Sequence, residues 1–138
     1  MTALHTPTTD QPIPLDQPLP HRKTLREWLI PLSERSTLRA FLLLILDYAL
    51  FFSLIAGTIV FDAVWAKLLC GLAAGFVIGR LFIIGHDACH QSLTPRRELN
   101  KVLGRIAFLP SLTPYSLWDT GHNVVHHGYT NLKGVDFV

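Results

Sequence analysis

Two short stretches of the sequence hold five of its seven histidines. The first cluster comprises His86 and His90, and the second comprises His122, His126 and His127. In an α-helix, residues four positions apart lie one turn apart on nearly the same face, so His86 converges with His90 and His122 converges with His126. His127 points about 100° away from His126. Neutral imidazole binds iron, zinc, copper and nickel, so the two clusters predict a metal site.

Polar residues beside the histidines are candidates to orient the imidazole rings. Asp87 follows His86 directly, Asn123 follows His122, and Asp119 precedes His122 by three positions. A carboxylate or amide beside a metal-binding histidine can fix its tautomer through a hydrogen bond. We therefore expect Asp87, Asp119 and Asn123 to orient the metal-binding imidazoles through hydrogen bonds without binding the metal themselves. Helix capping or surface solvation is the alternative for Asp87 and Asn123, and direct ligation is the alternative for Asp119.

The composition indicates the kind of protein that positions these residues. Hydrophobic residues make up 49% of the 138-residue chain and charged residues only 16%, which points to a membrane protein with one domain at most. The formal net charge of +2 is too small to indicate a nucleic-acid partner. A histidine-rich site without a pair of thiolates also differs from a structural zinc finger.

Two apolar runs precede the first cluster, at about residues 40–61 and 64–84. The first run has 22 residues, which as a helix would be about 33 Å long and would cross the ~30 Å hydrocarbon core of a bilayer. Asp62 and Ala63 mark a tight turn between the runs, so they predict a transmembrane helical hairpin. Asp47 lies inside the first run and should face protein or water, because a carboxylate in lipid is costly.

The segments outside the hairpin are predicted from composition and capping signals. Residues 1–23 hold five prolines among polar residues, so we expect them to be disordered. A short helix should begin at Thr24, and Thr94-Pro95 and Thr113-Pro114 predict further helices at about 95–108 and 114–127. The 95–108 helix is amphipathic, with Leu99, Val102, Leu103 and Ile106 on its apolar face, which indicates a helix at the membrane interface.

Charge and glycine spacing predict how the hairpin is placed. Basic residues crowd both of its outer ends, and the turn has few, so the positive-inside rule predicts that the N-terminus and both histidine clusters are cytoplasmic. Gly71, Gly75 and Gly79 form a stripe on which a further helix could pack. The predicted fold class is an all-α membrane protein, a transmembrane helical hairpin followed by cytoplasmic interfacial helices that carry the histidines.

The stretches Gly85-His86-Asp87-Ala88-Cys89-His90-Gln91-Ser92 and Gly121-His122-Asn123-Val124-Val125-His126-His127 resemble the first and second histidine boxes of the membrane fatty acid desaturases. The neighbouring sequence is similar to bacterial acyl-lipid desaturases of the Δ12 (omega-6) kind. The resemblance covers roughly residues 38–138. It implies that residues 24–138 are the N-terminal part of a desaturase domain in a bacterial inner membrane.

The resemblance also implies the chemistry. A non-haem centre of two iron ions would be ligated by His86, His90, His122, His126 and His127, with O2 as co-substrate. A membrane lipid or acyl substrate would lose two hydrogens, with electrons from a ferredoxin or cytochrome-type donor. The family carries a third histidine box after two further spans, which these 138 residues lack. We therefore expect a fragment or a truncated gene product with partial metal affinity and no desaturase turnover.

Other functions fit the same residues. A related di-iron lipid or carotenoid hydroxylase or ketolase would use the same scaffold, and a non-enzymatic membrane protein could bind a metal or a haem through paired histidines. A zinc intramembrane protease would need His-Glu-x-x-His, whereas Asp87 follows His86 here. A structural hairpin with incidental histidines is the remaining alternative.

Overall fold

The computed structural model describes residues 21–130 and residue 132. These residues form helices and no strand, which confirms the predicted all-α class. The chain divides into two compact units, residues 1–34 and residues 35–138. The segment predicted to be disordered, residues 1–23, lies almost entirely outside the described residues, and so does the sequence after Leu132.

The first unit contains helix α1 (Arg22–Leu29) and a short 3₁₀ helix, η1 (Ile30–Leu32). Helix α1 begins two residues before the predicted start at Thr24. The reason is its cap, because Nδ1 of His21 accepts a hydrogen bond from the backbone N–H of Lys23 at 3.3 Å. Pro31 lies in the 3₁₀ turn that follows, as its missing N–H requires.

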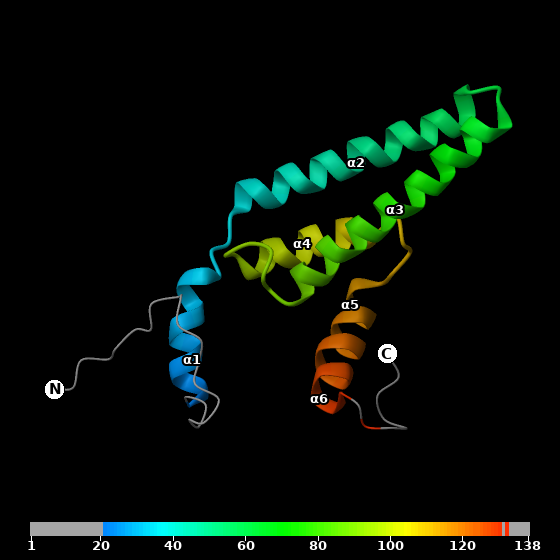
Figure 1. Cartoon of the computed structure of the whole chain (residues 1–138). Coiled ribbons are helices and arrows are strands. Elements are labelled where there is room, and N and C mark those ends of the chain that lie inside the picture. The colour runs from blue at the N-terminus through cyan, green and yellow to red at the C-terminus, as the bar shows by residue number, and fades with distance from the viewer. Residues whose placement is uncertain (1–20, 131, 133–138) are drawn as a thin grey trace, which may run out of the picture. The chain divides into compact units, whose positions relative to one another are not determined.

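The second unit is built on two long antiparallel helices, α2 (Thr37–Val60) and α3 (Val64–Cys89), joined by a three-residue turn (Figure 1). Both are long and apolar enough to cross a membrane. Only 17% of the most apolar window of α2 and 28% of that of α3 is buried within the chain. A core helix of a water-soluble protein would be mostly buried, so the exposed apolar faces of this hairpin fit a lipid environment.

Besides its apolar core, the hairpin has two specific contacts between α2 and α3. Asp47 is 1% exposed and accepts hydrogen bonds from Nε of Arg80 at 3.0 Å and from Nη2 at 2.8 Å. The expectation that Asp47 faces protein is therefore confirmed. Near the turn, a Cβ atom added to Gly57 would lie 2.8 Å from Sγ of Cys70, so glycine is what lets the two helices approach each other.

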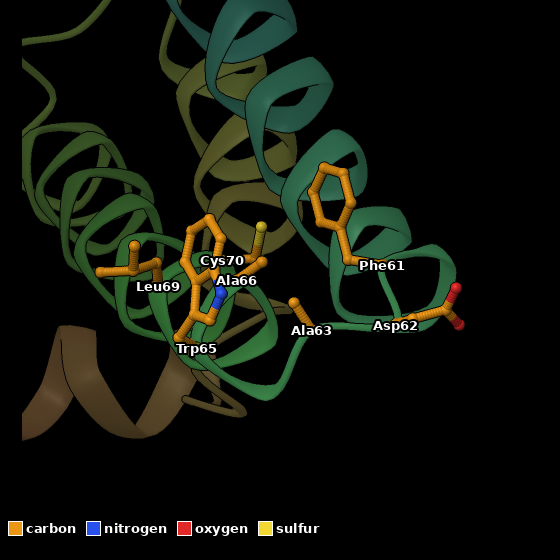
Figure 2. Close-up of a pocket in the computed structure, with 7 residues that line it drawn as sticks. All are labelled: Phe61, Asp62, Ala63, Trp65, Ala66, Leu69 and Cys70. Carbon is orange, nitrogen blue, oxygen red and sulfur yellow. The ribbon is translucent and has the colours of Figure 1, made fainter.

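An apolar cavity of about 360 Å³ lies at the turn of the hairpin (Figure 2). It is lined by Phe61, Asp62, Ala63, Trp65, Ala66, Leu69 and Cys70. His86 is 21 positions after Trp65 on the same helix, which corresponds to roughly 30 Å. This cavity therefore lies far from the histidines.

Helix α4 (Arg97–Phe108) packs against the second half of α3. It begins two residues later than predicted, because Pro95 and Arg96 are not helical and the Oγ1 atom of Thr94 accepts from the N–H of Arg96 at 3.2 Å. Its face buried against the protein comprises Asn100, Leu103, Gly104, Ala107 and Phe108. Val102 and Ile106 are 49% and 37% exposed, so their apolar side chains remain on the outside.

Tight contacts fix α4 in place. A Cβ atom at Gly85 would lie 2.6 Å from two ring carbons of Phe108, and one at Gly104 would lie 2.5 Å from the ring of Tyr115. The hydroxyl of Tyr48 on α2 donates to the carbonyl of Ile106 at 2.5 Å. Helix α4 is thereby attached to both arms of the hairpin.

The last segment, predicted as one α-helix at 114–127, has three parts. Helix α5 (Tyr115–Trp118) is followed by a π-helix, η2 (Asp119–His126), and a final turn, α6 (His127–Tyr129). The backbone N–H of His127 donates to the carbonyl of His122, five positions earlier. Gly121 lies within the π-helix, and glycine has a low intrinsic preference for the α-helix, so it lowers the cost of the wider turn.

Candidate metal centre

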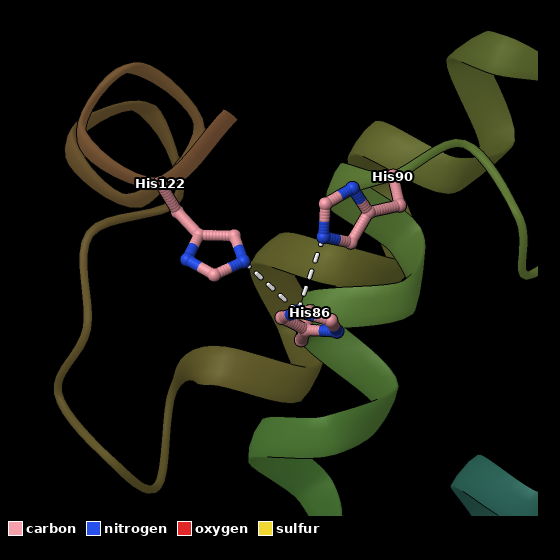
Figure 3. Close-up of side chains that lie close together, drawn as sticks. All are labelled: His86, His90 and His122. Atoms are coloured by element: carbon pink, nitrogen blue, oxygen red, sulfur yellow. Dashed lines mark hydrogen bonds between the residues drawn. The ribbon is translucent and has the colours of Figure 1, made fainter. Parts of the chain in front are cut away.

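Helix α3 continues past the apolar run and ends with the first cluster. His86 lies in its last turn and His90 is its C-cap. The two imidazoles point to the same side, with their Nε2 atoms 3.1 Å apart, as the four-residue spacing predicts (Figure 3).

The second cluster reaches the first through His122. Its Nε2 atom lies 3.0 Å from Nε2 of His86, so His86 lies between His90 and His122 (Figure 3). The ligand nitrogens of these three residues all lie within 4.8 Å of one another. The fold thus brings together histidines from the two predicted clusters, although His90 and His122 are 32 positions apart in the sequence.

The remaining two histidines surround this trio. The ring of His127 lies 4.8 Å from the rings of both His90 and His122, measured between centroids. The ring of His126 stacks on that of His122 at 5.2 Å and 21°. All five predicted ligand residues are therefore in one cluster, with His86, His90 and His122 at its centre.

The separation of the central nitrogens fits a metal ion. Two nitrogens 3.0 Å apart, each about 2.1 Å from one ion, subtend an angle of about 90° there. An angle of this size occurs between neighbouring ligands of one metal ion, so the pair could hold a metal. In addition, Nδ1 of His122 is buried and has no hydrogen-bond partner among the described residues.

Burial and charge repulsion favour the neutral form of two of the imidazoles, His122 and His90. Burial, and after it charge repulsion from His86 and His127, lowers the pKa of His122 to about 4. The pKa of His90 is also lowered, first by burial and then by His86 and His127. Because a metal binds the neutral form of imidazole, these shifts leave the ligands ready near neutral pH.

The three predicted supporting residues differ in what they contact. Oδ1 of Asp87 lies 3.2 Å from Nδ1 of His86, so a proton on Nδ1 can be donated to the carboxylate while Nε2 keeps its lone pair. Asn123 donates to the carbonyl of Cys89 at 3.0 Å and to Oδ1 of Asp119 at 2.6 Å. Asp119 and Asn123 therefore tie the π-helix to the end of α3.

Sequence reasoning gave no role to the aromatic residues that support the site. The indole of Trp118 stacks on the ring of His122 at 4.8 Å and 14°. Phe82 meets Trp118 edge-on at 4.8 Å, and Phe108 lies 5.1 Å from Phe82. Burial raises the pKa of Tyr115 to about 12, so this phenol stays neutral. The four-residue spacing of Trp118 and His122 was a signal that could have predicted the stack.

Known proteins similar to this chain identify the same region. The model of the family described as "Fatty acid desaturase" matches residues 62–138, which contain the whole histidine cluster. The omega-3 fatty acid desaturase fat-1 of Caenorhabditis elegans is 32% identical over 102 residues, which cover 71% of this chain and 25% of that protein. No solved structure shows significant similarity.

Two further relatives are also named as fatty acid or acyl-lipid desaturases. The sn-1 oleoyl-lipid 12-desaturase of Arthrospira platensis is 40% identical over 62 residues, 45% of this chain and 17% of the relative. The chloroplastic omega-6 fatty acid desaturase of Spinacia oleracea is 29% identical over 130 residues, 88% of this chain and 28% of the relative. The chain therefore spans about a quarter or less of the length of most of these relatives.

Proposed function

The chain belongs to the fatty acid desaturase family, and on this premise we propose that it carries part of a di-iron centre for O2-dependent desaturation of a membrane-associated acyl chain. The observation that supports the proposal most directly is the convergence of His86, His90 and His122 at the end of an apolar hairpin. Five imidazoles are too few for two iron ions with four or five ligands each. We propose that the remaining ligands come from protein outside these 138 residues.

In the proposed centre, His86, His90, His122, His126 and His127 hold the iron. When bound, iron supplies the activation of O2 that removes two hydrogens from a saturated acyl chain. Asp87 accepts the Nδ1 proton of His86 and thereby directs its Nε2 atom to the metal. Trp118 stacks on His122, and Phe82 and Phe108 pack on Trp118, so apolar rings lie against one side of the cluster.

The proposed setting follows from charge and from the relatives. Basic residues lie at the start of α2 and along α4, so we propose that this end of the hairpin, with the histidines, is cytoplasmic in a bacterial inner membrane. One relative is named a ferredoxin-dependent sn-1 acyl-lipid omega-3 desaturase. By analogy we propose a lipid-borne acyl substrate and a ferredoxin or cytochrome-type electron donor.

The test separates metal binding from turnover. The 138-residue chain in detergent is loaded anaerobically with Fe(II), and bound iron is measured after desalting for the natural sequence and for His86→Gln. We expect retained iron that the substitution abolishes, and no double-bond formation by this chain alone. Equal iron in both proteins would contradict the proposed ligands. Product analysis of membranes containing the complete protein then distinguishes a desaturated acyl chain from a hydroxylated one.

A further inference from the structure

A second cavity, of about 200 Å³, lies at the end of the hairpin that carries the histidines. It is lined by Arg35, Gln91, Pro95, Arg97 and Asn100. These residues come from the segment just before α2, from the loop after α3 and from the first turn of α4. The ribbon shows the three segments meeting at this end of the second unit (Figure 1).

The charge of the cavity is positive. Arg35 and Arg97 are exposed, and neither makes an ion pair within the described part of the chain. No carboxylate lines the cavity. Glu98, next to Arg97, is paired with Lys101 at 3.0 Å, whereas Glu34, next to Arg35, makes no ion pair among the described residues. Two guanidinium groups without a protein partner at one cavity are suited to bind an anion, and their planar forks match phosphate oxygens.

The buried side chain of Asn100 lines the cavity and is held by hydrogen bonds to Thr94. Asn100 is 1% exposed, and its Oδ1 atom accepts from the N–H of Thr94 at 2.8 Å and from its hydroxyl at 2.7 Å. One N–H of its Nδ2 group donates to the carbonyl of Thr94 at 3.0 Å. A side-chain amide has two N–H groups, and the second has no partner among the described residues. This buried amide can therefore donate to a bound anion.

Helix α4 adds to the positive electrostatic potential at the cavity. It has 12 residues, and its N-cap, Arg96, makes no side-chain capping bond. The N–H groups of its first turn have no partner within the helix, and the positive end of its dipole lies at the cavity. We infer that this cavity, called here the phosphate pocket, binds the phosphate group of a membrane phospholipid.

Location and size favour a lipid phosphate over a soluble one. The pocket lies just before the first residue of α2 and just beyond the last residue of α3, the two helices long enough to cross a membrane. When these helices span a bilayer, the pocket is at the level of the lipid phosphates. The volume is below the range of pockets that enclose whole small molecules, so it accepts a headgroup phosphate while the acyl chains stay outside.

The experiment measures lipid retained by the 138-residue chain. The chain is extracted into non-ionic detergent doped with phosphatidylglycerol or with diacylglycerol, which lacks phosphate, and bound lipid is counted by native mass spectrometry. The test variant is Arg35→Gln with Arg97→Gln. The matched control is Arg39→Gln with Arg96→Gln, which removes the same charge from neighbouring residues that do not line the pocket.

Compared with the natural sequence, we expect the test variant to retain about tenfold less phosphatidylglycerol. The control should lose no more than about a factor of two. Asn100→Asp keeps the acceptor for Thr94 but places a negative charge at the cavity, so it should also lose the lipid. Circular dichroism checks that each variant keeps its helices. Neither the lipid measurement nor circular dichroism requires bound iron or enzymatic activity. A negative result would therefore contradict the phosphate pocket and not the proposed function.

Three results would overturn the inference. Equal losses in the test and control variants would show diffuse attraction by surface charge. Equal retention of diacylglycerol would show that the acyl chains, and not the phosphate, are bound. Displacement of phosphatidylglycerol by submillimolar inorganic phosphate would show a site for the free ion.

Discussion

At the scale of single residues, His86 is the centre of the cluster, because its Nε2 atom lies within 3.1 Å of Nε2 of both His90 and His122. Its other nitrogen faces Asp87. The tautomer of His86 therefore decides whether a lone pair or a proton points into the cluster, and the carboxylate of Asp87 stabilises the tautomer that binds metal.

Replacing Asp87 by alanine should weaken metal binding without removing a ligand. Loss of such a supporting hydrogen bond typically costs about 10-fold to 100-fold in metal affinity. Competition of the chain with a chelator for Fe(II) under anaerobic conditions measures the change. Asp62→Ala, at the turn of the hairpin, is the control and should leave the affinity as it was. An unchanged affinity in Asp87→Ala would show that the tautomer is set by another contact.

The metal-free protein should lose stability in acid because of His122. Its pKa is lowered from 6.5 to about 4 in the folded chain, so the unfolded state binds more protons between these values. Stability is then complete above about pH 6.5 and falls as the pH decreases toward 4. The contribution is at most about 3 kcal/mol. Thermal unfolding from pH 7.5 to 4.5 measures it, and His122→Gln should flatten the slope. An equal slope in both proteins would contradict this assignment.

At the scale of elements, glycines decide how closely the helices approach. Gly85 faces the ring of Phe108, and Gly104 faces the ring of Tyr115, whereas a Cβ atom at Gly71, Gly75 or Gly79 would meet nothing within 4 Å. The stripe predicted to receive a helix is thus open within the described residues. Close packing within the chain is permitted instead by Gly85 and Gly104.

Gly85→Ala and Gly71→Ala should therefore change stability in opposite directions. The methyl group at Gly85 would collide with Phe108, which cannot move freely because it is fully buried, and overpacking of this kind costs about 1–3 kcal/mol. At Gly71 the methyl group enters open space, and alanine favours the helix by up to about 1 kcal/mol. Thermal unfolding in detergent compares the two. A Gly85→Ala variant as stable as Gly71→Ala would contradict the contact with Phe108.

The limits of sequence reasoning also appear at this scale. The hairpin, the helix after Thr94 and the convergence of His86 with His90 follow from hydrophobic runs, capping signals and four-residue spacing. The π-helix around His122 did not follow, because periodicity assumes a uniform α-helix. The side of α4 that packs against the protein was not predicted either. Asn100 and Gly104 face the protein there, one bonded to Thr94 and the other against Tyr115, and neither is recognised as buried from hydrophobicity.

At the scale of the whole second unit, the cluster depends on three separate attachments. Tyr48 bonds α2 to α4, Phe108 packs on Gly85 of α3, and Asn123 bonds the π-helix to the carbonyl of Cys89. Each attachment joins an element to the end of the hairpin that carries His86 and His90. The apolar outer faces of α2 and α3 are exposed within this unit, so they are available to contact lipid or further protein.

The arrangement requires that both outer ends of the hairpin lie on one side of the membrane. Ser36 precedes α2 and Ser92 follows α3, whereas Asp62 lies in the turn between the helices. In a background with Cys70 and Cys89 replaced by alanine, single cysteines at Ser36 and Ser92 should react with a membrane-impermeant maleimide only after the inner face is exposed. A cysteine at Asp62 should react in intact cells, which is the control for labelling from outside. If the cysteines at Ser36 and Ser92 reacted from opposite sides, α2 and α3 could not both span the membrane, and the two ends of the phosphate pocket could not meet.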